Sequence, residues 1–282
     1  MISFQTGDIV ANGIRIHYYR TGGTPAGGNK PPLVLAHGAT DDGLCWTPVA
    51  EVLAADYDVI LPDARGHGLS EATDAGNDSA TRAADLAAFI QALGLRKPAI
   101  GGHSMGAESA FLVAAEHPYL SACVVLEDPP FWLDAAAAAA REDPKGARVS
   151  FADQTAKSKA ATREQLIAFC RQQSPTWPEA DLGPWADAKQ RVSLSAFAAP
   201  WKPAELGWRE GFHLIKSPVL LVTADPKLGA IITSELASAI VAESPLVQSV
   251  FFAGAGHNIR REAFDEFIEA VRDFLSRSYS PN

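Results

Sequence analysis

Apolar residues along the chain fall into short continuous runs, with longer stretches of helical periodicity between them. The runs that predict buried strands cover residues 33–36, 59–63, 97–101, 122–126, 219–222 and 247–252. The helical stretches are one-sided, as where Leu86, Phe89 and Ile90 share a face. Residues 8–20, divided by an Asn-Gly turn, predict an opening hairpin. Strands that alternate with helices predict an α/β protein with a mostly parallel sheet covered on both faces.

Residues 131–212 interrupt this alternation. The segment predicts helices without strands, beginning with an alanine run after Asp134 and continuing with a capping box at 162–165. Five of the six tryptophans fall in it: Trp132, Trp177, Trp185, Trp201 and Trp208. We therefore predict a core made of residues 1–130 and 213–282, with residues 131–212 forming a separate helical lid.

A serine stands between the strand predicted at 97–101 and a helical pattern that begins at Ala107. Gly102 and Gly106 flank Ser104 at two residues on either side. This G-x-S-x-G spacing needs small residues there, because the serine backbone is strained and neighbouring chains pass close by. The turn exposes the hydroxyl at a helix N-terminus, where free N–H groups favour developing negative charge. Ser104 is therefore the candidate nucleophile.

Composition excludes several classes of partner. The 282 residues carry a net charge of −9 and 47% are hydrophobic, with Lys and Arg scattered, so no nucleic-acid partner is expected. Cys45, Cys123 and Cys170 are widely spaced, which fits a reducing compartment better than a disulfide framework or a metal site. Neither a signal peptide nor a transmembrane segment is expected. We predict a cytoplasmic monomer or homodimer that binds a small molecule and no membrane.

Five sequence signatures, taken in order, resemble the α/β-hydrolase family, specifically its lid-bearing type. They are His37-Gly38-Ala39, Asp63-Ala64-Arg65-Gly66-His67-Gly68-Leu69-Ser70, the Ser104 turn, Thr223-Ala224-Asp225 and Gly254-Ala255-Gly256-His257. The resemblance covers nearly the whole chain. It implies the α/β-hydrolase fold, a mostly parallel twisted sheet flanked by helices, with the helical lid inserted between two late strands. It implies no metal and no organic cofactor.

The resemblance also implies roles for particular residues. His257, in the loop before the last helix, matches the general base that a serine nucleophile needs. Asp225, after the first strand beyond the lid, matches the usual position of the acid that orients this histidine. Asp128, at the end of the strand before the lid, is the alternative position that some relatives use. We predict Asp225 and keep Asp128 as the alternative.

Two backbone N–H groups are implied as the oxyanion hole. Met105 follows the nucleophile and Ala39 lies in the loop after the first central strand. Asp41 and Asp42 come next along that loop, and we expect them to be solvated turn residues.

The substrate is less constrained than the catalytic groups. Trp132, Trp177 and Trp185 are candidates to line a dry pocket for an apolar or ring-containing acyl group, or else to attach the lid to the core. His103 before the serine favours a carboxylic ester or lactone. The alternatives are amide or C–C bond hydrolysis of ring-fission products, perhydrolysis, and cofactor-free lyase or oxygenase chemistry. A non-catalytic binding protein fits poorly, because the predicted triad is complete.

Overall fold

The computed structural model describes residues 3–22, 30–73, 77–131, 151–197 and 204–279. Its centre is an eight-stranded sheet in the order β1-β2-β4-β3-β5-β6-β7-β8. In that order the strands are β1 (Gln5–Ala11), β2 (Ile14–Arg20), β4 (Asp58–Pro62), β3 (Pro32–Ala36), β5 (Ala99–His103), β6 (Val124–Glu127), β7 (Val219–Ala224) and β8 (Val247–Phe252). β1 and β2 form the expected antiparallel hairpin, β2 pairs antiparallel with β4, and the pairs from β4 to β8 are parallel.

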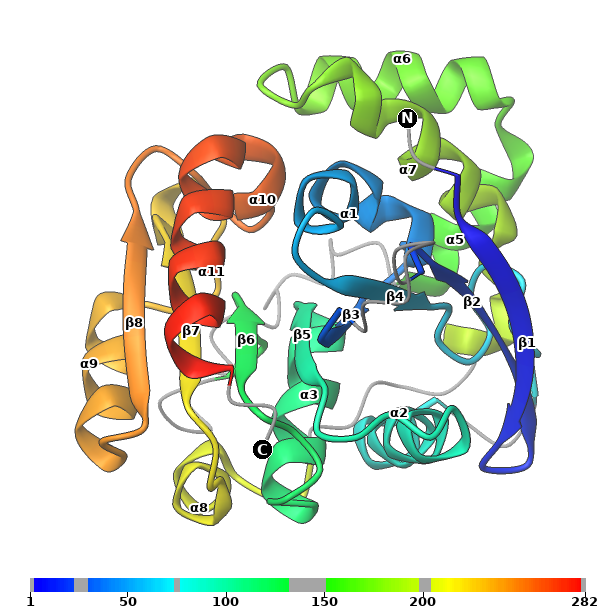
Figure 1. Ribbon diagram of the computed structural model, residues 1–282. Helices are drawn as coiled ribbons and strands as arrows, with labels where there is room; N and C mark the ends of the chain where they lie inside the picture. The colour runs from blue at the N-terminus through cyan, green and yellow to red at the C-terminus, as the bar shows by residue number, and fades with distance from the viewer. Residues whose placement is uncertain (1–2, 23–29, 74–76, 132–150, 198–203, 280–282) are drawn as a thin grey trace.

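Helices cover both faces of the sheet, which confirms the predicted fold class (Figure 1). The α-helices are α1 (Thr47–Leu53), α2 (Ser79–Ala92), α3 (Met105–Glu116), α5 (Phe151–Ala160), α6 (Arg163–Gln173), α7 (Glu179–Arg191), α8 (Trp208–Leu214), α9 (Ser234–Glu243), α10 (Ile259–Glu262) and α11 (Phe264–Ser278). Short 3₁₀ helices are η1 (Gly43–Trp46), η2 (Leu194–Phe197) and η3 (Pro226–Leu228).

The core lies in two layers, one on each face of the sheet. Because successive side chains of a strand point to opposite faces, Val34 packs in the layer under α2, α3, α8 and α9, whereas Leu33 and Leu35 pack in the layer under α1 and α11. All three side chains are buried. This two-sided burial explains why the central strands read as continuous apolar runs.

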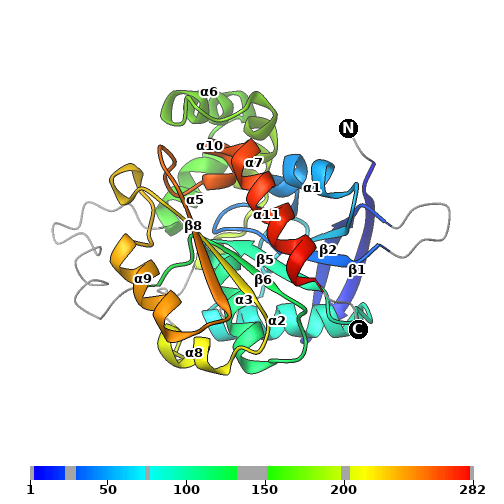
Figure 2. The same ribbon diagram turned by 60° about the vertical axis from the view of Figure 1, so that its left-hand side comes forward.

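The helical segment between β6 and β7 divides into two groups in space. α5, α6 and α7 lie together at one end of the molecule, and α7 packs against η1 (Figures 1 and 2). By contrast, α8 packs against α3 and α9, where Phe212 contacts Phe111 with ring centroids 4.9 Å apart. Trp132, Trp201 and the alanine run lie outside the described residues. Over the ranges described, each helix falls short of the length and apolar character that a bilayer crossing requires.

Candidate active site

The predicted strand, turn and helix around Ser104 are present, between β5 and α3. Ser104 has φ 51° and ψ −115°, a strained backbone conformation, and its N–H donates to the Glu127 carbonyl at 2.9 Å. A side chain at Gly102 would collide with the backbone of Gly106, and one at Gly106 would collide with the carbonyl of Ala36. The two glycines therefore let the turn close and let α3 begin against the end of β3.

His257 is paired with Asp128. The two side chains approach to 2.6 Å between His257 Nδ1 and Asp128 Oδ2. Asp128 is fully buried and has a left-handed backbone, with φ 44°. Its carboxylate also accepts hydrogen bonds from the N–H groups of Ile231, at 2.8 Å, and Ile232, at 2.9 Å. Three donors therefore fix this carboxylate, and it in turn fixes the orientation of the imidazole.

The structure corrects the prediction of Asp225 as the partner of His257. Asp225 does lie at the end of β7, but its carboxylate accepts from the N–H of Lys227 at 2.8 Å and begins η3. The chain then turns through Gly229, at φ 107°, and directs the amides of the following residues at Asp128. The loop after β7 thus supplies N–H donors to the acid instead of the acid itself, and the alternative position, Asp128, is the one in contact with the histidine.

His103 contacts the loop that contains His257. Its Nε2 lies 2.9 Å from the His257 carbonyl and therefore donates to it, and the two imidazole rings have centroids 4.5 Å apart. Burial holds the pKa of His103 well below its ordinary value, and the nearby Arg260 lowers it further. His103 is therefore a neutral spacer between the serine turn and His257. Its position beside the serine in the sequence gave no sign of this contact.

The loop with Ala39 lies against the start of α3. A tight turn is closed by a hydrogen bond from the Asp41 N–H to the Gly38 carbonyl, at 3.1 Å, and Ala39 is inside it. A side chain at Gly106 would also meet the His37 carbonyl, so this loop begins beside the first turn of α3. Met105 is the first residue of α3 and is buried. The two amides predicted as an oxyanion hole therefore belong to adjoining segments.

The expectation that Asp41 and Asp42 are solvated is wrong, because cations distant in sequence cover both. Asp41 is 4% exposed and Asp42 is fully buried. Asp42 pairs with Arg191 of α7 at 2.8 Å. Asp41 contacts three cations: Lys189, Arg260 and Arg261. Burial alone would raise the pKa of Asp41, but its three cationic neighbours hold that pKa well below the ordinary value.

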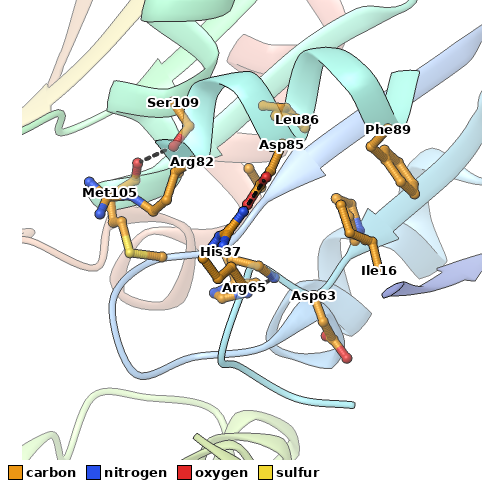
Figure 3. Close-up of a pocket in the computed structure, with 14 residues that line it drawn as sticks. Ile16, His37, Asp63, Arg65, Arg82, Asp85, Leu86, Phe89, Met105 and Ser109 are labelled. Carbon is orange, nitrogen blue, oxygen red and sulfur yellow. Dashed lines mark hydrogen bonds and ion pairs between the residues drawn. The ribbon is translucent and has the colours of Figure 1, made fainter. Parts of the chain in front are cut away.

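A small cavity lies behind the loop with Ala39 and is lined by His37, Arg65 and Met105, among others (Figure 3). Its volume is about 40 Å³, room for one or a few water molecules but not for an organic substrate. Arg65 is held there by Asp85, with both contacts at 2.8 Å. Arg65 and Asp85 therefore form part of the wall of this cavity.

The tryptophans of the predicted pocket have different positions. Trp177 donates from Nε1 to Glu262 at 3.3 Å, and the Arg261 guanidinium lies 4.3 Å from its ring centroid. The ring of Trp185 lies 4.9 Å from the ammonium of Lys189. Trp132 is outside the described residues. The contacts of Trp177 join the helical segment to the chain that follows His257.

The cysteines of the chain are poor candidates for a reactive thiol. The three cysteines are free and buried. Burial raises the pKa of Cys123 to about 12 and that of Cys170 to about 11, so both thiols stay protonated at neutral pH. Within the described ranges, no three His, Cys, Asp or Glu side chains converge as metal ligands.

Comparisons with known proteins identify the family of the chain. A family model described as "Alpha/beta hydrolase family" matches residues 33–270. The N-formylmaleamate deformylase of Pseudomonas putida is 29% identical, with 95% of this chain and 96% of that protein covered. The solved E-2-(acetamidomethylene)succinate hydrolase has a TM-score of 0.79 at 20% identity, covering 97% of this chain and all of that one. The solved N-formylmaleamic acid deformylase from Pseudomonas putida S16 has a TM-score of 0.74 at 26% identity, covering 95% of this chain and all of that one. The chain belongs to the α/β-hydrolase family.

Proposed function

We propose that the protein is a serine hydrolase that forms an acyl-enzyme on Ser104, with His257 as general base and Asp128 as the acid of the triad. The observation that carries the proposal is the 2.6 Å contact between His257 and Asp128, made beside the strained serine turn. Nucleophile, base and orienting acid, each on a separate loop, are the set that activates a serine hydroxyl.

The reaction proceeds in two halves. The Ser104 oxygen attacks the substrate carbonyl as His257 Nε2 takes the hydroxyl proton, and the N–H at Nδ1 donates to Asp128 throughout. The tetrahedral oxyanion accepts hydrogen bonds from the amides of Ala39 and Met105. The imidazolium then gives its proton to the nitrogen or oxygen of the leaving group. The bond from the former carbonyl carbon to that atom breaks, and the acyl group stays bonded to the Ser104 oxygen. Water, deprotonated by His257, then attacks the acyl carbon. The bond from that carbon to the Ser104 oxygen breaks, the imidazolium returns its proton to this oxygen, and the acyl group leaves as the carboxylic acid.

For the substrate we propose an amide with a small N-acyl group. The support is the similarity to the N-formylmaleamate deformylase along nearly the full length of both proteins. The second candidate is a carboxylic ester or lactone, which the histidine before the serine favours. Both classes share the acyl-enzyme and differ in the leaving group. An amine leaves only when protonated, so an amide substrate depends more strongly on the acid form of His257.

We further propose that α5, α6 and α7 act as the lid over the serine. Their helices are those of the predicted insertion, and Trp177 and Arg191 fasten them to the loops that follow His257 and Ala39. The described tryptophans contact charged groups. This supports a role in attaching the lid to the core and not in lining an apolar acyl pocket.

A substrate panel tests the proposal. N-formylmaleamate, p-nitrophenyl acetate and γ-butyrolactone are assayed with the parent protein and with Ser104→Ala, and both proteins are exposed to a fluorophosphonate. We expect turnover of the amide and of the activated ester, loss of both in the variant, and one phosphonyl group on Ser104 by mass spectrometry. Labelling elsewhere, or activity retained without Ser104, contradicts the mechanism. Turnover of only the ester and the lactone would select the second substrate class.

A further inference from the structure

A buried lysine of the proposed lid reaches the loop of the oxyanion hole. Lys189, near the end of α7, is 8% exposed. Its ammonium donates to the Thr40 carbonyl at 2.9 Å and to the Asp41 carboxylate at 2.8 Å. α7 also packs against η1, which directly follows this loop. One side chain therefore binds both the backbone and the side chain of the turn that contains Ala39.

The turn is one that needs to be held. Thr40 has φ 61°, a left-handed conformation that is costly for a β-branched residue. Strained residues persist when their surroundings fix them from several sides. Here the hydrogen bond between Gly38 and Asp41 closes the turn, and Lys189 fixes the carbonyl of the strained residue. Ala39, the proposed oxyanion donor, is the residue immediately before Thr40.

The remaining partners of Asp41 belong to the core and do not touch the Thr40 carbonyl. Arg260 and Arg261 contact Asp41 Oδ2 at 3.2 and 3.0 Å, whereas Lys189 contacts Oδ1. Loss of the lysine would leave the buried carboxylate with two guanidinium partners. It would remove the contact to the Thr40 carbonyl that Lys189 makes from the lid. Loss of Lys189 thus affects both the charge around Asp41 and the turn at Thr40, whereas a change at Thr40 acts on the turn alone.

We propose that Lys189 is a positioning residue that holds the Ala39 amide in place for the tetrahedral oxyanion and so makes the oxyanion hole depend on the docking of α7. This inference rests on the proposed serine mechanism. An oxyanion donor acts mainly in the transition state, so its displacement lowers kcat and leaves KM nearly unchanged. Removal of such a donor costs about 10²–10³ in turnover, and we expect its misplacement to cost about 10–100-fold.

The test compares Lys189→Met with Lys159→Met, using whichever substrate of the panel is turned over fastest. Lys159 is an exposed lysine of α5 that donates to the Gln190 carbonyl of α7, so it controls for the loss of a lysine contact to this helix. We expect Lys189→Met to lower kcat with KM unchanged. It should lower the affinity for an alkyl trifluoromethyl ketone by the same factor, because this inhibitor forms a tetrahedral adduct on the serine. Lys159→Met should change neither.

Glycine at position 40 sharpens the test, because glycine adopts a left-handed conformation without steric cost. Thr40→Gly in the Lys189→Met background should recover most of the lost kcat and inhibitor affinity. Equal turnover of Lys189→Met and the parent, or a loss confined to KM, overturns the inference. So does a loss that Thr40→Gly leaves unchanged. Fluorophosphonate labelling of the parent separates these outcomes from failure of the serine mechanism, in which the parent itself is not labelled.

If Lys189→Met does not fold, as judged by thermal unfolding, Lys189→Arg takes its place and keeps a positive charge beside Asp41. Its planar guanidinium cannot occupy the single position between the Thr40 carbonyl and the carboxylate. We then expect equal factors of loss in kcat and in inhibitor affinity. No loss in Lys189→Arg, with Lys189→Met unfolded, would assign the lysine to stability alone and overturn the inference.

Discussion

Asp128 and Asp225 each follow the end of a strand, and the two strands are parallel neighbours in the sheet. The two aspartates differ in burial and in hydrogen-bond partners. Asp128 follows β6, is fully buried and contacts His257. Asp225 follows β7, is partly exposed and caps a short 3₁₀ helix through the Lys227 amide. Chain position therefore brings a carboxylate to the right edge of the sheet but does not decide which one orients the histidine.

The difference lies in the direction of the chain after each strand. At Asp128 the backbone adopts φ 44°, in the left-handed region that is costly for a residue with a side chain. At Asp225 the chain enters η3 and returns past Asp128, where the N–H groups of Ile231 and Ile232 donate to its carboxylate. The strain at the first position and the cap at the second together place one acid, with its donors, in contact with His257.

The largest expected effect comes from removing the histidine that Asp128 orients. His257→Ala should lower kcat by about 10⁶, because triad members act as a unit and the serine loses its base. Ser104→Ala should lose the same factor, and the double variant should lose no more than either single one. Additive losses in single-turnover assays would show that the two residues act independently and would contradict the triad.

A smaller effect, on stability, tests the surroundings of the strand that ends at Asp128. Arg260 donates to the neighbouring Glu127 from its backbone at 2.9 Å and from its guanidinium at 3.2 Å. Both side chains are buried, so Arg260→Met leaves Glu127 without its charge partner and should cost about 3–5 kcal/mol of unfolding free energy.

Glu127→Gln in the Arg260→Met background should restore part of this stability, because the buried group is then neutral. Urea unfolding at neutral pH measures both variants. An Arg260→Met protein as stable as the parent would show that the pair of Arg260 and Glu127 contributes nothing to the stability of the fold around β6.

Asp63 is a third aspartate that follows a strand, and it is buried without being part of the proposed triad. It follows β4, is buried, and accepts from the amides of Gly43 and Leu69. Burial and, to a smaller extent, the nearby Asp42 together raise the pKa of Asp63 to about 7. The folded state thus binds this proton more tightly than the unfolded chain, whose aspartate titrates near 4.

Stability from Asp63 is therefore fully present below about pH 4 and is lost as the pH rises to about 7. Asp63→Asn cannot titrate. The difference in unfolding free energy between the parent and this variant should decline across that window and level off above it. A difference that stays constant from pH 4 to 8 would show that Asp63 is charged throughout.

Much of the architecture was predictable from local pattern. Continuous apolar runs fixed the parallel strands, and the small residues around Ser104 fixed the turn, because both depend on neighbours in the sequence. The choice between Asp128 and Asp225 was not predictable, since it depends on where the chain goes after η3. The burial of Asp41 was missed for a similar reason: its partner Lys189 lies 148 residues away.

The measurement that tests the account most directly is the turnover of Asp128→Asn beside Asp225→Asn, with folding of both checked by thermal unfolding. Asp128→Asn should lower kcat by about 10⁴, the size found for the acid of a Ser-His-Asp triad, because the amide cannot hold the correct imidazole tautomer. Asp225→Asn should stay within about a factor of two of the parent, because the amide oxygen of asparagine can still accept the hydrogen bond from the Lys227 N–H that caps η3. The reverse ranking would move the acid to the end of β7 and contradict the pairing of His257 with Asp128.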